Sequence, residues 1–288
     1  MVIIQNDTLL VEISETGAEL QRVFNKKTNI EYLWNGDNLY WGRRAPLLFP
    51  IVGKLKEGKM RLDSGEYYIS QHGFVRDMIF ELNDSTTFRA DLMVRSNQVT
   101  KKMYPFDWVL QCRYTLKNNM LDVKTIISND SSHSDMLFSV GYHPAFRVPL
   151  EQNLTFSDYY LRFNKDTKHE KSLLKDGLID DKTVKGFDNY TIPLSEDTFL
   201  QDALVFKGLK SNEILLKSDK TKHGIKFTFD GFPYLGIWSK PGASFVCIEP
   251  WHGIADSVHH DGNFSSKEGL IKLEAGRKFM CGYEIELY

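Results

Sequence analysis

The sequence has few cysteines and no long apolar run. Its 288 residues include three cysteines, at 112, 247 and 281. An odd number of widely spaced cysteines, each inside an apolar segment, favours neither a disulfide framework nor a zinc site. We interpret all three as small core residues. No apolar stretch approaches the roughly 20 residues of a membrane span, and the first residues lack the basic and apolar regions of a signal peptide. We therefore expect a cytoplasmic protein with no membrane partner.

The sequence also lacks an excess of positive or negative charge. Lys and Arg number 36 against 38 Asp and Glu, which gives a formal net charge of -2. A nucleic-acid partner requires a basic face, so this balance argues against one. The chain has no glycine-rich phosphate loop, no dinucleotide fingerprint and no Gly-x-Ser-x-Gly nucleophile elbow. Covalent catalysis therefore has no obvious nucleophile.

Aromatic residues and short alternating segments are abundant. The chain has 19 Phe, 13 Tyr and 5 Trp, a content that suits a strand-rich core and a cleft that stacks on sugar-like rings. Residues 108–116 alternate with period two, and residues 121–127 follow after a hairpin-length connection, so we predict an antiparallel pair. Helical periodicity is almost absent, with only residues 253–260 able to form a turn or two. The sequence predicts a mostly β protein, as a sandwich or barrel.

The chain reads as a single domain over residues 1–288. Residues 148–200 are more polar and irregular, and are too long for a plain turn, so they either carry their own strands or cross over a sheet. We find no linker, repeat or low-complexity tract.

Three segments place acid or base groups beside aromatic side chains. They are residues 71–76, 141–146 and 247–253, and each follows a strand-like run. We expect them to meet in one cleft. Within the second segment, Gly141 permits a tight backbone and Pro144 restrains His143 to extended geometry at a strand end. His143 could also be a structural histidine bonded to the backbone.

His72 and Arg76 are candidates for binding oxygen atoms. An imidazole can donate a hydrogen bond, and a guanidinium presents a fork of donors. The alternative for Arg76 is a surface ion pair with Asp77 or Glu81, which would carry no function.

Glu249 is the most unusual of the candidates, because it follows a buried-looking strand and is walled by Pro250 and Trp251. A carboxylate against an apolar wall loses solvation, and its pKa rises toward the range of a general base. The alternative is a buried glutamate neutralised by Arg43 or Arg44.

Residues 252–260 raise a metal hypothesis. His252, Asp256 and His260 would share one face of a helix. Gly253 weakens such a helix, and no third imidazole completes the set, so we favour an exposed loop and predict no metal site.

The order of these motifs resembles the aldose 1-epimerase (galactose mutarotase-like) family. The resemblance rests on His-Gly-Phe-x-Arg at 72–76, Gly-x-His-Pro at 141–144 and Glu-Pro-Trp at 249–251, with further similarity at 17–20 and 45–53. It covers nearly the whole chain and is closest to a small bacterial branch linked with lactose utilisation. The family implies a large antiparallel β-sandwich, the galactose mutarotase-like supersandwich, with one sugar cleft.

The resemblance also implies an activity, the interconversion of the α and β anomers of a free aldohexose. Glu249 would be the base, His143 the acid, and no cofactor would be needed. His72 and Arg76 would hold sugar hydroxyls. The remaining substrate-binding candidates are Arg44, Trp251 and an aspartate, for which Asp202 is preferred and Asp197 stays open. The expected partner is a small sugar, and the chain would be a monomer or homodimer.

Two other functions remain possible. A hexose-6-phosphate 1-epimerase could use Arg43, Arg44, Arg76 and Lys54 for phosphate contacts. A non-catalytic carbohydrate-binding or sensing protein would use the acid and base groups only as hydrogen-bond partners.

Overall fold

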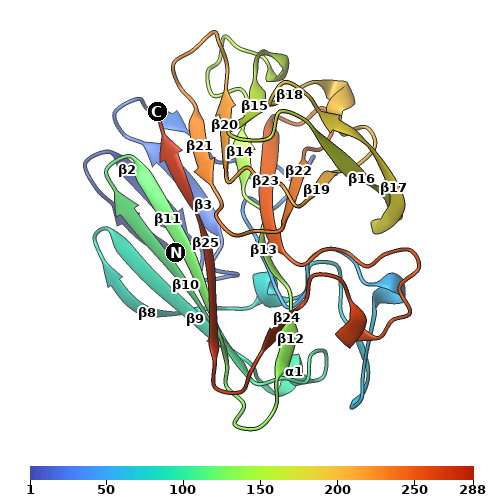
Figure 1. Ribbon diagram of the computed structural model, residues 1–288. Coiled ribbons are helices and arrows are strands. Elements are labelled where there is room, and N and C mark those ends of the chain that lie inside the picture. The colour runs from blue at the N-terminus through green and yellow to red at the C-terminus, as the bar shows by residue number, and fades with distance from the viewer.

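The computed structural model describes residues 1–288 and consists mainly of antiparallel strands (Figure 1). The largest sheet has nine strands. In spatial order these are β18 (Thr191–Pro193), β15 (Tyr160–Phe163), β20 (Glu213–Lys217), β21 (Ile225–Thr228), β25 (Lys278–Leu287), β11 (Met120–Asn129), β10 (Trp108–Lys117), β9 (Arg89–Arg95) and β8 (Glu81–Thr86).

A second sheet of eight strands packs against the first. Its order is β17 (Leu178–Phe187), β16 (His169–Lys175), β19 (Leu204–Lys207), β22 (Tyr234–Trp238), β23 (Phe245–His252), β13 (Val140–Tyr142) and β5 (Leu47–Leu48), with β14 (Ala145–Arg147) also paired to β23. Side chains of the two sheets meet between them: the Tyr142 ring lies 4.8 Å from that of Tyr283, and the Phe146 ring 5.7 Å from that of Phe227. The two sheets therefore form a sandwich.

Smaller elements surround this sandwich. The strands are β1 (Val2–Gln5), β2 (Leu9–Ile13), β3 (Leu20–Asn25) and β4 (Ile30–Glu31) in one sheet, and the pairs β6 (Lys59–Leu62) with β7 (Gly65–Tyr68) and β12 (Met136–Phe138) with β24 (Ile271–Leu273). Helices are short: α1 (Gln98–Lys101), and the 3-10 turns η1 (Lys56–Gly58), η2 (Val75–Asp77), η3 (Phe156–Asp158), η4 (Glu196–Phe199) and η5 (Phe264–Ser266). The mostly β class is confirmed. None of these helices has the length and apolar character to cross a membrane.

The predicted hairpin of residues 108–127 is confirmed. Strands β10 and β11 pair from Trp108 opposite Asn129 to Lys117 opposite Met120. Alternate residues of β10 are buried, as the period of two predicts. The largest buried apolar cluster has 65 members and draws on the chain from Val2 to Leu287. A single domain over 1–288 stays a prediction, which this shared core supports.

Two ambiguous segments are now placed. Residues 148–200 carry their own strands, and the β16–β17 hairpin extends the second sheet. Residues 253–260 form no helix, in agreement with the favoured loop, but residues 253–256 are buried, so the expectation of an exposed loop is wrong for them. Gly253 has a φ of +109°, and an added Cβ there would lie 2.1 Å from the Ser139 hydroxyl. The backbone instead runs beside Lys54, whose carbonyl accepts the Asp256 N–H at 2.9 Å.

A buried ion pair holds this segment in place. Lys267 Nζ lies 3.0 Å from Asp256 Oδ1, and both side chains are fully buried. Lys267 Nζ also donates to the Ile254 carbonyl, and Asp256 Oδ2 accepts the Lys56 N–H at 2.9 Å. Burial lowers the pKa of Lys267. These contacts therefore fix residues 254–256 both to Lys56, which precedes them in the chain, and to Lys267, which follows them.

We predict that Lys267→Met lowers the free energy of unfolding by about 3–5 kcal/mol, because Asp256 would be left as a buried charge without its cation. Urea unfolding followed by circular dichroism measures this. The matched control is Lys185→Met, which removes an exposed pair with Asp188 at 3.0 Å and should change stability by less than about 1 kcal/mol. Equal losses in the two variants would contradict the prediction.

Candidate active site

The site is built on β23, which is buried along its length apart from His252. One face of this strand carries Val246 and Ile248, which belong to the core between the sheets. The other face carries Cys247, Glu249 and Trp251, because side chains alternate along a strand. Glu249 and Trp251 on this second face line a cavity.

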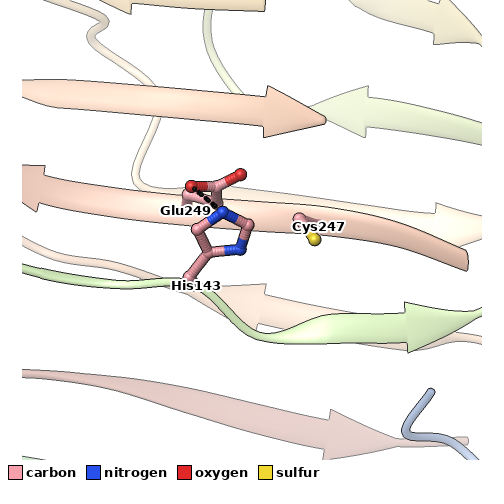
Figure 2. Close-up of side chains that lie close together, drawn as sticks. All are labelled: His143, Cys247 and Glu249. Carbon is pink, nitrogen blue, oxygen red and sulfur yellow. Dashed lines mark ion pairs between the residues drawn. The ribbon is translucent and has the colours of Figure 1, made fainter. Parts of the chain in front are cut away.

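Strand pairing sets His143 opposite Glu249. On one side of residues 143–144, Gly141 lies opposite Trp251, and on the other, Ala145 lies opposite Cys247. The register is the same before and after the interruption, so the residue midway, His143, faces Glu249. Its Nε2 atom lies 3.1 Å from Glu249 Oε2 (Figure 2). Two groups over 100 residues apart in sequence are thus cross-strand neighbours.

Burial shifts the two pKa values of this pair in opposite directions. His143 is 8% exposed and Glu249 is 2% exposed. Loss of solvation raises the pKa of Glu249 well above its usual value, and the charge of Asp202 adds to the rise. Loss of solvation also lowers the pKa of His143 well below its usual value, and His72 adds to that effect. The shifts make the carboxylate a stronger base and the imidazolium a stronger acid.

Two glycines make room for Trp251. A Cβ at Gly141 would lie 2.5 Å from the Trp251 ring, and one at Gly236, on neighbouring β22, would lie 2.4 Å from it. The Trp251 ring therefore occupies the space that side chains at Gly141 and Gly236 would otherwise fill. Its Nε1 makes no hydrogen bond within normal geometry, although it is close enough to Glu249 to offset part of the rise in that pKa. Trp251 lines the cavity as expected.

Trp41 packs directly on His143. The ring centroids are 4.8 Å apart with an angle of 31° between the planes. The Trp34 indole N–H donates to the Trp41 carbonyl at 2.8 Å, which fixes the loop that carries Trp41. Trp238 completes the wall, with its ring 5.8 Å from that of His143. The imidazole is therefore held between aromatic rings and the strand.

His72 enters the site from a strained turn. Its φ is +67°, and the following Gly73 has no space for a side chain, since a Cβ would lie 2.0 Å from the Phe49 carbonyl oxygen. The backbone N–H of Gly53 donates to His72 Nδ1 at 3.2 Å, which leaves the proton on Nε2. Although the ring keeps some exposed area, burial and the charges of Arg76 and Arg43 lower its pKa to about 3. His72 is a neutral donor at ordinary pH.

Arg76 lies on η2 and lines the cavity. Its Nη2 donates to the Gln71 carbonyl at 2.8 Å. The alternative ion pair with Asp77 is long, at 4.0 Å, and Asp77 is bound more closely by Arg43 at 2.7 Å. The guanidinium thus keeps donors for a ligand, because only part of its capacity is used.

The cavity has a volume of about 380 Å³. Its lining combines His143, Glu249 and aromatic rings with aliphatic side chains. The aliphatic residues are Leu174, Ile179, Ala203, Val205, Ile254 and Ala255. Asp202 lines the cavity, whereas Asp197 lies on η4 and does not.

These positions correct one sequence-based expectation, that Arg44 binds substrate, and they bear on the alternatives left open for Glu249 and His252. Arg44 does not line the cavity, because its guanidinium donates to the Gln21 carbonyl and its N–H to Glu19 at 2.6 Å. Glu249 pairs with His143 and with no arginine. His252 is separated from the site, since its ring packs 4.5 Å from that of Phe232.

The family model described as aldose 1-epimerase matches residues 1–272. The chain belongs to the aldose 1-epimerase family. Protein LacX (plasmid) of Lactococcus lactis subsp. lactis is 30% identical, over 94% of this chain and 93% of its own length.

Two solved structures share the family fold. A galactose mutarotase related enzyme from Lactobacillus acidophilus is 34% identical with a TM-score of 0.95, over 100% of this chain and 97% of that one. A galactose mutarotase-like protein from Lactobacillus casei ATCC 334 is 32% identical with a TM-score of 0.93, over 100% of both chains. These structures confirm the antiparallel sandwich that the motif resemblance implied.

The structure also adds residues that the motifs did not indicate. Trp41, Trp238 and Gln71 line the cavity beside the family residues. Cys247, interpreted as a core residue, is buried but lies near His143 and Glu249. Its spacing of two residues from Glu249 on a strand was the available signal, because such residues share a face.

We predict that His72 stays neutral between about pH 5 and pH 8, with its proton on Nε2, whereas an unperturbed histidine gains a proton near 6.5. Long-range ¹H–¹⁵N NMR of the imidazoles measures both the tautomer and the charge. A blocked histidine peptide in the same buffer is the control, with the midpoint near 6.5 of an unperturbed imidazole. A midpoint for His72 above about 6 would contradict the burial argument.

Proposed function

We propose that this protein is an aldose 1-epimerase, an isomerase that interconverts the α and β anomers of a free aldohexose. The observation that carries the proposal is the buried His143–Glu249 pair, 3.1 Å apart on one side of a 380 Å³ cavity. Anomer exchange requires one proton to leave the C1 hydroxyl and one to reach the ring oxygen. Both oxygens are attached to C1, so the acid and base must lie side by side, as these two do.

The chemistry then follows from the pair. Glu249 takes the proton of the C1 hydroxyl, the C1=O double bond forms, and the bond from C1 to the ring oxygen breaks as His143 protonates that oxygen. Rotation about the C1–C2 bond presents the other face of C1. Closure reverses each transfer: His143 recovers the proton and Glu249 returns one to the C1 oxygen. Atoms and charges balance without a cofactor.

The opposite pKa shifts suit these roles. A raised pKa strengthens Glu249 as a base, and a lowered pKa strengthens protonated His143 as an acid. Without substrate, the two pKa shifts favour the state in which Glu249 is protonated and His143 is neutral, so that the pair holds one proton, on the carboxyl group. The direct contact lets that proton cross between Nε2 and Oε2, so both arrangements remain accessible.

The surrounding residues supply hydroxyl contacts. His72 Nε2–H and the free guanidinium donors of Arg76 are suited to sugar oxygens, and the Asp202 carboxylate is suited to accept from hydroxyls. Trp251 and Trp41 offer apolar faces for the carbon side of a sugar ring. Each of these side chains lines the same cavity.

A phosphorylated substrate is less well supported. Of the four basic residues that could bind phosphate, only Arg76 lines the cavity. Arg43 is paired with Asp77 at 2.7 Å, and the Lys54 amine donates to the Asp176 carbonyl at 3.0 Å. Arg44 points elsewhere. We therefore favour a neutral sugar, and equal rates on a hexose and its 6-phosphate would agree with this choice.

A non-catalytic sugar-binding protein would need only hydrogen-bond partners. It would have no reason to bury an acid and a base in direct contact, because burial of ionisable groups without a catalytic use is unfavourable. Sugar binding by calorimetry without anomer exchange above background would favour this alternative.

We predict that Glu249→Gln and His143→Ala each lower kcat/KM by about 10²- to 10⁴-fold, because each removes one proton-transfer group. NMR or polarimetry of freshly dissolved α-D-glucose and α-D-galactose measures the exchange. Matched controls are Glu268→Gln and His133→Ala, which change exposed residues outside the cavity. Failure of the wild-type protein to accelerate exchange of any aldose in a panel would sink the proposal.

We predict a broad pH optimum for kcat/KM. The active pair holds one proton, and burial makes it hard to add a second to His143 or to remove the last from Glu249. Activity should therefore fall only well below the ordinary histidine pKa of about 6.5 on the acid side, and only above neutrality on the alkaline side. After subtraction of the uncatalysed rate, an acid limb centred near pH 6.5 would contradict this assignment.

A further inference from the structure

Cys247 is a buried nucleophilic group that the proposed reaction does not use. Its Sγ, a ring nitrogen of His143 and a carboxylate oxygen of Glu249 all lie within 4.8 Å of one another. Figure 2 shows Cys247 and Glu249 on the same strand, with the imidazole of His143 reaching them from the neighbouring one. We propose that these three side chains form a binding site for Zn²⁺, and that the metal inhibits the protein by occupying its acid and base.

The donor set matches the cation. Zn²⁺ takes sulfur, nitrogen and carboxylate ligands, and three protein ligands with one open position form a common kind of site. On a tetrahedral ion with bonds of about 2.0–2.3 Å, neighbouring donors lie about 3.3–3.8 Å apart. The three atoms therefore need to shift by on the order of 1 Å, within the range of side-chain rotation. The cavity leaves the fourth position for water.

Hydrogen bonding distinguishes Cys247 from the other two cysteines. The Cys112 thiol contacts the Thr125 hydroxyl and the Cys281 thiol contacts the Tyr142 hydroxyl, whereas the Cys247 thiol has no hydrogen-bond partner. His143 Nδ1 is also buried without a partner. His143 and Glu249 line the cavity, so an ion can reach the site from there, while Cys247 lies beside them in a small apolar cluster.

Charge balance favours the bound state. Zn²⁺ displaces the thiol proton of Cys247 and the proton shared by the His143–Glu249 pair, and both protons leave to solvent. One thiolate, one carboxylate and one neutral imidazole then compensate the two positive charges. A neutral complex avoids the penalty of an isolated charge in a buried site.

The test measures binding before activity. Zn²⁺ is titrated into the full-length protein in competition with a chromophoric chelator, and Co²⁺ is used separately as a visible probe. We expect one Zn²⁺ per chain and a thiolate-to-cobalt charge-transfer band. Cys247→Ala should lose the band and weaken Zn²⁺ binding at least about tenfold, while Cys112→Ala and Cys281→Ala should leave both unchanged. If the alanine variant folds poorly, the nearly isosteric Cys247→Ser variant replaces it and should likewise lose the band and bind Zn²⁺ more weakly.

Inhibition is the second readout, and it alone rests on the proposed function. Zn²⁺ should raise the apparent KM of the wild-type protein for sugar, and Cys247→Ala should exchange anomers while resisting Zn²⁺. Absence of wild-type binding, or binding that survives loss of Cys247, overturns the site. Zn²⁺ binding at Cys247 without any anomer exchange leaves the metal site standing and refutes the activity.

Discussion

The pairing of β23 with strands on both of its sides is the constraint on which the site depends. Glu249 obtains its position from the strand, and His143 obtains its position from a neighbouring segment that keeps one register across an interruption. On the opposite side β22 supplies Gly236, whose missing side chain leaves space for Trp251. A slip of one residue would turn Glu249 into the core between the sheets.

Burial on this strand underlies both the proposed reactivity of the His143–Glu249 pair and its proposed affinity for Zn²⁺. The same loss of solvation raises the pKa of Glu249 and lowers that of His143, and the Trp41 ring, from a separate loop, helps to exclude water from the pair. The unsolvated donor atoms that we propose for proton transfer are also the ligands that we propose for the metal ion. Cys247 completes that set because strand alternation directs it to the side of Glu249.

The sequence predicted local structure better than long-range geometry. Alternation alone predicted the β10–β11 hairpin, because its two strands are adjacent in the chain. The three motif segments were correctly expected to meet, but no sequence pattern expresses the register between residues 143 and 249. Arg44 was misplaced because the direction of its side chain depends on hydrogen bonds to Glu19 and Gln21, which lie over 20 residues away. Trp41 was missed because its loop is fixed by tertiary contacts, including the bond from Trp34.

The central place of β23 also bears on how the protein loses its site. Amides in a strand paired on both sides exchange with solvent only through the largest opening motions of a domain, whereas loops and edges open at little cost in free energy. His143 and Glu249 therefore belong to the part of the molecule that opens last. Partial unfolding at the periphery, such as detachment of the outer β8 strand, would leave their spacing intact, and their separation would accompany the collapse of the whole sheet.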